Sequence, residues 1–365
     1  MNRLLIGLTG NIATGKSVVR RMLVNHGALG LDADVIAHRM LYPGGKAYQP
    51  VIDVFGADIL TPQKEISRVK LGKVVFSNPD RLKALEDLVH PAVTADIEER
   101  TNRASLPVGV IEAIKLLETP LAGFCQSIWV SQASPAHQME RLLHARMMSE
   151  ALARERISAQ SPQAEKLKQA DVVINTESDF SQTWKQVRQA LNDTIQLEAT
   201  LPTPHIKINP KFNVHTAGAF PAEALETFWA AHSGRESDDL YQHLAFNVVQ
   251  VITHQKQITA ILICEDWNFT SSLKAVIASP EVHVPMAVIL EAFQTAAIER
   301  QSELLILSEQ VLANWPADEA PDPFGYRRQS ARDFTFPAWR QAVLRQSGTE
   351  EQPIWVRQVA QAFAE

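Results

Sequence analysis

The chain has 365 residues, of which 45% are hydrophobic and 21% charged, and its formal net charge is −6. This composition excludes a disordered tail protein or a collagen-like repeat, and the length predicts two or three domains. Residues 1–195 carry 23 Lys and Arg against 21 Asp and Glu, a net +2, whereas residues 196–365 carry 12 against 20, a net −8. The acidic second part argues against non-specific nucleic-acid binding there.

The cysteine content and the N-terminal sequence bear on the cellular compartment that we expect for this protein. Cys125 and Cys264 are too few for a disulfide framework and have no metal-ligand spacing, which fits a reducing environment. The first residues lack the cleavage pattern of a signal peptide, and no uninterrupted apolar run reaches the ~18 residues of a membrane span. We expect a cytoplasmic protein whose partners are small molecules, without a nucleic-acid or membrane partner. The sequence leaves the oligomeric state open.

Short apolar runs alternate with helical patterns in the first part of the chain. The pattern predicts strands at 4–8, 28–31, 108–114, 127–131 and 172–175. It predicts helices at 17–25, 34–41, 139–160 and 180–197, and a mostly helical segment at 46–100 with breaks at Gly56, Pro62 and Pro79. This alternation indicates an α/β fold, a parallel sheet with helices on both faces.

The alternation of strand and helix patterns stops after residue 197, where a proline-containing segment begins. Pro202, Pro204 and Pro210 favour an extended connector, so we expect one domain at 1–197, a linker at 198–210 and a second domain at 211–365. The second domain should be α+β, with strands at 244–253, 258–264, 273–278 and 304–307 and helices at 284–300 and 309–314.

The strongest motif matches GxxxxGK[ST] and lies between a predicted strand and a predicted helix. Its members are Gly10, Asn11, Ile12, Ala13, Thr14, Gly15, Lys16 and Ser17, followed by Val18. The glycines let backbone N–H groups point at phosphate oxygens, and the helix turns its positive end toward the same anion. Lys16 would reach the β- and γ-phosphates of ATP, and the Ser17 hydroxyl would ligate Mg²⁺.

Two aspartates end the second predicted strand. Ligands of open α/β sheets bind at the carboxyl ends of strands, so Asp32 and Asp34 should lie near the phosphate loop. Asp34 could accept the proton of an acceptor hydroxyl, and Asp32 could orient Mg²⁺ or a water. The alternative is that an aspartate here caps the following helix, and local sequence leaves both readings open.

A series of blocks in order resembles the dephospho-CoA kinase family. They are IGLTGNIATGKS, LDADVIAHRML, YPGGKAY, FGADIL, ISRVKL, LVHP and RISAQSPQAEKLKQADVVINT. The resemblance covers residues 1–195 and implies a nucleoside-monophosphate-kinase-like P-loop fold. It also implies ATP-dependent phosphorylation of the ribose 3′-hydroxyl of dephospho-CoA, giving coenzyme A. Another P-loop kinase of small metabolites or nucleosides is the alternative.

The resemblance also implies roles for single residues. Asp34 takes the position of the general base, Lys16 and Arg146 act on the transferred phosphoryl group, and Asn175 lies by the adenine. The arginines Arg141, Arg146 and Arg156 fall in a lid, where solvated helix-face charge is the alternative for each. Remaining substrate contacts are assigned to Asp32, Arg156, Glu112 and His90, although His90-Pro91 could instead cap and break helices.

The sequence departs from the family pattern at several positions. The family has Gly where Asn11 and Ala13 stand, and an Ala13 methyl is tolerable there only if its φ is negative. Glu112 replaces an Asp at a strand end but could still serve Mg²⁺ through water. Lys115 is new, and could pair with a substrate phosphate, with Glu112 or with Glu118.

The second domain has an element order similar to that of GNAT-type N-acyltransferases. Those enzymes hold the pyrophosphate of acetyl-CoA on a Gly-rich turn before the central helix. The corresponding segment here, EVHVPM at 281–286, has no glycine. We therefore favour an interaction or regulatory module without chemistry over a second active site.

Overall fold

The structure is a computed structural model that describes residues 3–198, 205–207, 211–313 and 321–359. The first half contains a five-stranded parallel sheet in the order β2-β3-β1-β4-β5. Its strands are β1 Leu4–Thr9, β2 Leu29–Asp32, β3 Val108–Glu112, β4 Ser127–Gln132 and β5 Val172–Asn175. The predicted P-loop-type α/β architecture is therefore confirmed.

Helices surround this sheet. They are α1 Lys16–Asn25, α2 Ala33–Met40, α3 Tyr48–Phe55, α4 Arg68–Val75, α5 Pro79–Arg103, α6 Pro135–His144, α7 Glu150–Ser158, α8 Gln163–Leu167 and α9 Phe180–Glu198. The short 3₁₀ turns of the first half are η1 Ala57–Ile59, η2 Leu116–Glu118 and η3 Pro120–Phe124.

Two helical predictions need correction. The stretch 139–160 is not one helix: α6 ends at His144, Met147 takes a left-handed φ of 52°, and the Ser149 hydroxyl accepts from Leu152 N–H to start α7. Pro91 does not break a helix, because α5 runs through it from Pro79 to Arg103. Side chains of α5 on both sides of Pro91 are buried in the core, and this packing outweighs the cost of an internal proline.

The second half contains an eight-stranded mixed sheet in the order β12-β13-β11-β10-β9-β8-β7-β6, in which only β10 and β11 pair in parallel. Its strands are β6 His205–Lys207, β7 Phe212–Thr216, β8 Val248–His254, β9 Gln257–Trp267, β10 Thr270–Ala278, β11 Leu304–Leu307, β12 Arg327–Gln329 and β13 Ile354–Gln358.

Helices also accompany the second sheet. They are α10 Ala222–Ser233, α11 Ser237–Phe246, α12 Met286–Glu299, α13 Glu309–Leu312 and α14 Pro337–Ser347, with 3₁₀ turns η4 Ala217–Ala219, η5 Asp322–Phe324 and η6 Ala331–Asp333. The predicted α+β character of this half is confirmed. The strand predicted at 244–253 begins later, because 244–246 form the last turn of α11.

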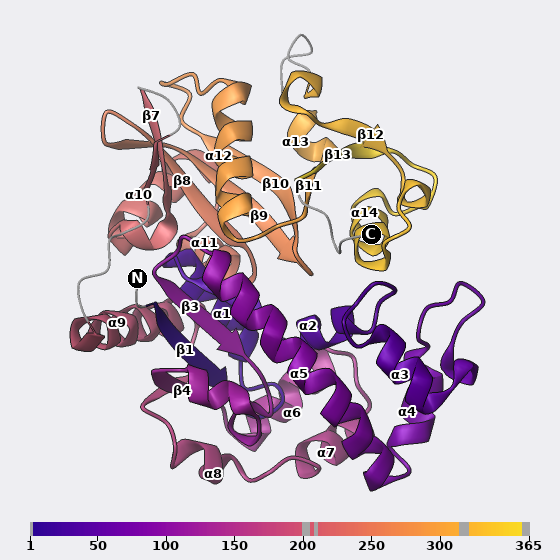
Figure 1. Ribbon diagram of the computed structural model, residues 1–365. Helices are drawn as coiled ribbons and strands as arrows, with labels where there is room; N and C mark the ends of the chain where they lie inside the picture. Colours follow the sequence, from indigo (N-terminus) through magenta and orange to yellow (C-terminus); the bar gives the residue numbers. More distant parts are fainter. Residues whose placement is uncertain (1–2, 199–204, 208–210, 314–320, 360–365) are drawn as a thin grey trace.

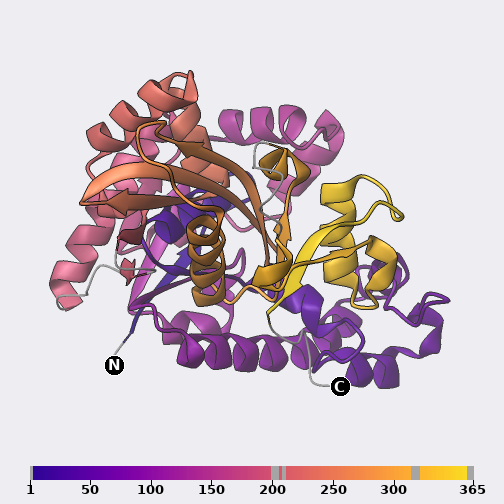
Figure 2. The same ribbon diagram turned by 90° about the horizontal axis from the view of Figure 1, so that it is seen from above.

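One of the buried hydrophobic clusters spans both halves. Figure 1 shows the second half, salmon to yellow, seated on the first, and both Figure 1 and Figure 2 place the yellow end beside the indigo segment. Arg340 pairs with Glu65 at 2.9 Å in that region. A buried cluster joins α1 and α9 to the second half through Val19, Met22, Leu23, Trp184, Val187, Leu225, Trp229, Leu244, Val249 and Ile261. The second half therefore covers an apolar face of the first.

The predicted linker at 198–210 falls largely outside the described residues, which omit 199–204 and 208–210. Within it, residues 205–207 form β6, which pairs antiparallel with β7 at the edge of the second sheet. The division into domains at 1–197 and 211–365 stays a prediction.

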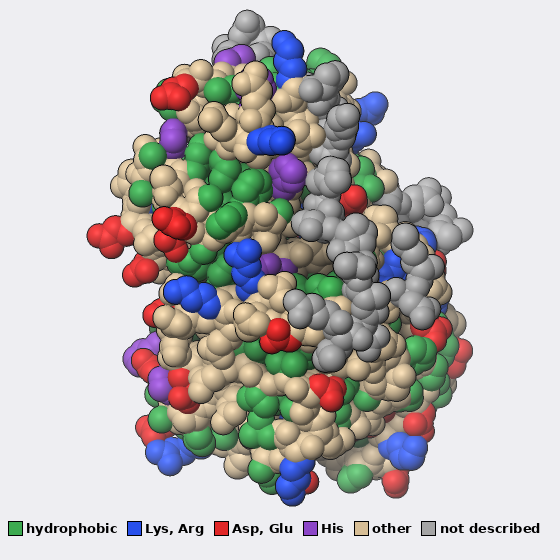
Figure 3. Space-filling model, turned by 90° about the vertical axis from the view of Figure 1, so that its left-hand side faces the viewer, with side chains coloured by type: hydrophobic (Ala, Val, Ile, Leu, Met, Phe, Trp, Pro, Cys, Tyr) green, Lys and Arg blue, Asp and Glu red, His purple; other side chains and the backbone are tan. Residues whose placement is uncertain are grey.

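Charged side chains are distributed over the surface of both halves. On the face shown in Figure 3, Lys, Arg, Asp and Glu side chains of both signs lie scattered over the upper and lower parts. Within the described residues, every helix is too short or too polar to span a bilayer.

Candidate active site

A cavity of about 920 Å³ opens where the strands of the parallel sheet end. Its wall includes most of the side chains that the sequence singled out, namely Ile12, Ala13, Gly15, Lys16, Ser17, Val18, Asp32, Asp34, Glu112, Arg141, Arg146 and Arg156. The remaining loop residues Gly10, Asn11 and Thr14 are buried beneath it. The topology therefore brings the phosphate loop, the acidic residues and the lid arginines to one place.

Two glycines of the loop take backbone conformations that other residues rarely adopt. Gly10 has φ 148° and Gly15 has φ 84°. A Cβ at Gly10 would lie 2.6 Å from the carbonyl oxygen of Ser131, and one at Gly15 would lie 2.9 Å from Thr176 Oγ1. The loop thus requires glycine at both positions for conformation and for space.

Ala13 differs from expectation. Its φ is 59°, in the left-handed region, whereas the sequence led us to expect a negative angle. The methyl group packs against a small apolar cluster made by Ile12 and by residues of α6, of α7 and of the loop between them, namely Leu142, Ala153, Met139, Met148 and Ile157. The strain of roughly 1–2 kcal/mol is compensated in part by this contact between loop and lid.

Side chains from the segment after α7 hold the first N–H groups of the loop. Gln163 Oε1 accepts from Asn11 N–H at 3.0 Å, and Gln160 Oε1 accepts from Ile12 N–H at 2.7 Å. Gln163 Nε2 also donates to the carbonyl of Ser131 at 2.9 Å. These glutamines were not predicted as site residues, although both lie in the block RISAQSPQAEK that carried the family resemblance.

Lys16 lies folded back over the loop. Its Nζ donates to the carbonyl oxygens of Gly10 at 2.9 Å and Asn11 at 3.0 Å. Burial lowers the pKa of Lys16 to about 8, although the negative charge of Glu112 opposes the shift. Lys16 is 8% exposed, and within the described residues its hydrogen bonds go to neutral carbonyls, so an anion in the loop would be a stronger partner.

Glu112 and Asp32 form a polar cluster with the start of α1. Ser17 Oγ donates to Glu112 Oε1 at 2.9 Å, and Arg20 Nε donates to Glu112 Oε2 at 2.6 Å. Arg20 also reaches Asp32 Oδ2 at 3.4 Å. Asp32 caps α2 by accepting from Val35 N–H at 3.0 Å, so the capping alternative applies to this aspartate.

Asp34 is left available. Its side chain is exposed at the cavity wall, and within the described residues it forms no hydrogen bond or ion pair. Partial burial and the nearby charges of Asp32 and Glu112 raise the pKa of Asp34 to about 6, while Lys16 acts in the opposite direction. A carboxylate with its pKa close to neutrality and a free lone pair can accept a proton from a substrate hydroxyl.

The lid arginines divide into two kinds. Arg141 is fixed, because its guanidinium donates to the carbonyl of Ala13 at 3.0 Å and to Thr176. Arg146 and Arg156 are exposed at the cavity wall and form no hydrogen bond or ion pair within the described residues. Arg141 therefore supports the loop, while Arg146 and Arg156 are free to contact a bound anion.

Three other predicted residues lie off the cavity wall. His90 is half-buried on α5, and Asn175 at the end of β5 accepts from Glu177 N–H through Oδ1 at 2.9 Å. Neither lines the cavity, although Thr176, next to Asn175, does. Lys115 pairs with Glu86 at 2.9 Å rather than with Glu112 or Glu118.

The second half supplies part of the cavity wall, which the sequence did not predict. Asp238, Tyr241, Gln242 and Phe246, all on α11, line the cavity together with the start of α9. The local sequence of α11 carries no motif that could have signalled this, because its place depends on packing against α1 and α9 across the chain.

Comparison with known proteins identifies the first half. A family model described as dephospho-CoA kinase matches residues 4–182. Dephospho-CoA kinase from Streptomyces avermitilis is 38% identical over 191 residues, which cover 52% of this chain and 93% of that protein. Dephospho-CoA kinase from Carboxydothermus hydrogenoformans is 40% identical over 186 residues, which cover 50% of this chain and 90% of that protein.

Solved structures also match parts of this chain. TT1252 from Thermus thermophilus has a TM-score of 0.49 at 28% identity and covers 53% of this chain and 99% of that chain. An acetyl transferase from Salmonella typhimurium has a TM-score of 0.29 at 9% identity and covers 43% of this chain and 99% of that chain.

The family follows from the family model and from the relatives, which are matched over nearly their whole length. The chain belongs to the dephospho-CoA kinase family.

Proposed function

We propose that this chain transfers the γ-phosphoryl group of ATP to the ribose 3′-hydroxyl of dephospho-CoA, releasing coenzyme A and ADP. One observation carries the proposal: in a chain of this family, the free carboxylate of Asp34 faces the same cavity as the phosphate loop. A hydroxyl bound beside Asp34 would be in reach of a phosphoryl group bound in the loop.

In this mechanism the loop binds and the acid moves a proton. The N–H groups at the start of α1 and the Lys16 ammonium would hold the β- and γ-phosphates of ATP. Asp34 would accept the proton of the 3′-hydroxyl. At the same time the hydroxyl oxygen would bond to the γ-phosphorus, and the bond between that phosphorus and the oxygen of the leaving ADP would break. Arg146 and Arg156 would neutralise charge on the transferred group.

Mg²⁺ is the ion that the oxygen donors beside the loop would suit. Ser17 Oγ lies 2.9 Å from Glu112 Oε1, and Asp32 shares Arg20 with Glu112. Mg²⁺ prefers such hard oxygen ligands and commonly keeps several waters. Ser17 would hold the ion directly, with Glu112 and Asp32 bonding to its waters. When bound, the ion neutralises charge on the β- and γ-phosphates.

We place the reaction in the cytoplasm, and the state of the cysteines supports this. Cys125 and Cys264 are both free, and burial raises the pKa of each thiol to about 12. Neither depends on an oxidising compartment.

For residues 211–365 we propose a supporting and interacting role rather than acyl transfer. The segment before α12 has no glycine and ends in Pro285, which lacks an N–H group. It therefore lacks the glycines that let a backbone wrap closely around a pyrophosphate, and its proline offers no N–H group to one.

The test is direct product formation. Purified full-length protein with ATP, Mg²⁺ and dephospho-CoA should yield coenzyme A and ADP in equal amounts, measured by chromatography. A panel of nucleosides and small phosphorylatable alcohols tests the alternative of another P-loop kinase. Turnover of a panel member without turnover of dephospho-CoA would replace the proposed acceptor.

A further inference from the structure

Helix α11 of the second half presents one face to the cavity beside the phosphate loop. Asp238, Tyr241, Gln242 and Phe246 recur at helical spacing and all line the cavity. Tyr241 is 4% exposed and its hydroxyl donates to Glu226. Its side chain is therefore held in the core and is not available to a ligand in the cavity. Gln242 and Phe246 remain available toward the cavity.

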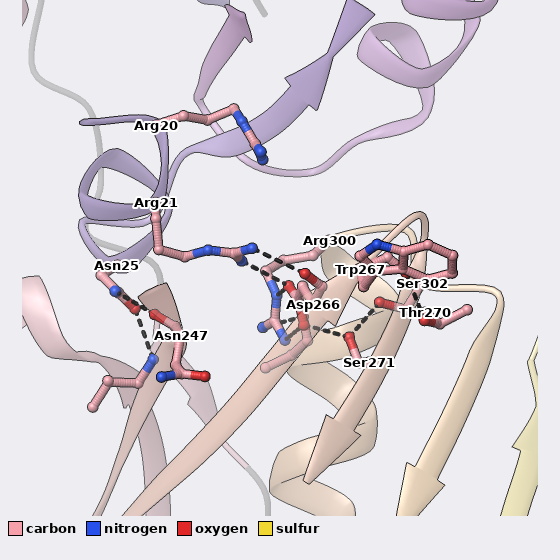
Figure 4. A network of polar contacts seen from close by, with 12 residues as sticks. Arg20, Arg21, Asn25, Asn247, Asp266, Trp267, Thr270, Ser271, Arg300 and Ser302 are labelled. Atoms are coloured by element: carbon pink, nitrogen blue, oxygen red, sulfur yellow. Dashed lines mark hydrogen bonds and ion pairs between the residues drawn. The ribbon is translucent and has the colours of Figure 1, made fainter. Parts of the chain in front are cut away.

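The position of α11 is fixed from α1. Asn25, at the last turn of α1, is fully buried, and its Nδ2 donates to the carbonyls of Leu244 and Asn247 at 2.9 Å each. Its Oδ1 accepts from Val249 N–H at 2.7 Å. Figure 4 shows the Asn25 side chain beside Asn247, the residue that follows α11. The helix that begins at the phosphate loop thus directly places the end of α11 that carries Phe246.

The sheet order shows which part of a bound nucleotide would reach α11. The phosphate loop follows the central strand β1. On one side of β1, Asp34 follows β2 and Glu112 is the last residue of β3, whereas on the other side Thr176 follows β5. Donor and acceptor lie on opposite sides of the transferred phosphorus in an in-line reaction. With the acceptor beside Asp34, the donor's nucleoside extends toward β5, where α9 and α11 meet.

The side chains at that end suit a planar base. Phe246 is 58% exposed, and its ring meets that of Phe180 edge-on, with centroids 5.3 Å apart and an interplanar angle of 85°. An exposed, oriented aromatic ring at a cavity wall offers a stacking surface to a base. Gln242 on the same wall offers both a donor and an acceptor.

We propose that α11 forms part of the donor-base site, with Phe246 stacking on the purine of ATP and Gln242 facing its polar edge. The inference rests on the proposed phosphoryl transfer and adds a binding contribution from the second half. Phe246 and Gln242 are thus specificity residues for the donor.

The experiment compares full-length variants by steady-state kinetics. Phe246→Ala should raise KM for ATP about tenfold, as loss of one base-stacking ring does, with KM for dephospho-CoA and kcat little changed. Phe246→Trp should restore the ATP value, because it keeps an aromatic face. Ile298→Ala, which removes another half-exposed apolar side chain of the second half, is the matched control and should behave as the wild type.

Inorganic tripolyphosphate provides a second probe, because it occupies the phosphate loop without a base. Its inhibition constant should be the same for Phe246→Ala and the wild type. Equal weakening of ATP and tripolyphosphate would overturn the proposal, since it would mean that the loop itself had moved. So would an unchanged KM for ATP, or a rise confined to dephospho-CoA, in a protein that still forms coenzyme A. Absence of coenzyme A formation by the wild type would instead count against the proposed function.

Discussion

The two ends of α1 are held by different halves of the molecule. At its start, the phosphate loop is bonded by Gln160, Gln163 and Arg141, all from the first half. At its far end, Asn25 bonds to the end of α11, and Arg21 pairs with Asp266 on β9 at 3.5 Å. Figure 4 shows both second-half contacts beside the pair between Asp266 and Arg300. The groups that would touch phosphate come from one half, and the placement of their helix depends on both.

Helix α2 repeats this division. Asp34 lies at its start and faces the cavity, while Arg39 near its end is buried against Glu303 of the second half at 2.6 Å. Changes at the cavity end should therefore affect the rate of reaction, and changes at the far end should affect stability. The following predictions test that separation, beginning with the largest expected effect.

Asp34→Asn removes the proposed proton acceptor while keeping the shape of the side chain. We expect kcat to fall by about 10²–10⁴, the usual contribution of a general base, with ATP affinity and thermal stability close to wild type. Stopped assays of coenzyme A formation and calorimetric titration of ATP measure the two quantities. Wild-type kcat in this variant would remove Asp34 from the mechanism.

Glu303→Gln removes the negative charge that pairs with two buried guanidinium groups, those of Arg39 and Arg100. Glu303 is 4% exposed and bonds to Arg39 at 2.6 and 2.7 Å, to Arg100 at 3.4 Å and to Trp339 Nε1 at 3.3 Å. The free energy of unfolding in urea should fall by about 3–5 kcal/mol, as for other broken buried ion pairs. Glu351→Gln, which weakens the exposed pair with Arg332, should change it by less than about 1 kcal/mol. Equal effects would mean that the two halves are not coupled through this pair.

The dependence of rate on pH follows from two shifted groups. Asp34 must be ionised to accept a proton, and its pKa is raised to about 6, so kcat/KM should fall about tenfold per pH unit below 6. Lys16 must be charged to bind phosphate, and its pKa is lowered to about 8, so kcat/KM should also fall above about 8. A bell-shaped profile is expected for the free enzyme. A flat rate between about pH 5 and 7 would contradict the acid limb.

Ala13 tests the loop itself and should give the smallest effect. Ala13→Gly relieves a left-handed residue but adds freedom to the unfolded chain and removes a methyl contact with the lid. These terms nearly cancel, so the free energy of unfolding should change by less than about 1 kcal/mol. Ala13→Val, with a branched side chain at positive φ, should destabilise the protein by more. Equal stability of the alanine and valine proteins would argue against the positive φ.

The first half was predictable because its signals are local. The glycine spacing of the loop and the apolar runs of the strands specify the fold around Gly10–Ser17, and the strand end before Asp34 places its carboxylate. The left-handed Ala13 and the bonds from Gln160 and Gln163 were not predictable, since both depend on the packing of α6, α7 and the segment after them. The contribution of α11 depends on contacts more than 200 residues apart in the sequence, such as the 219 residues between Asn25 and Leu244.

The buried pair of Arg39 and Glu303 also has a consequence for synthesis of the chain. Its members are 264 residues apart. At about 5–20 residues per second, the ribosome needs roughly 13–53 s to reach Glu303 after it has made Arg39. During that time Arg39 has no Glu303 carboxylate to pair with, and the second half has not yet been made to bury the apolar face of α1 and α9. We therefore expect chaperones that bind apolar surfaces to bind the nascent first half. They should dissociate from it once the second half is complete and covers that face.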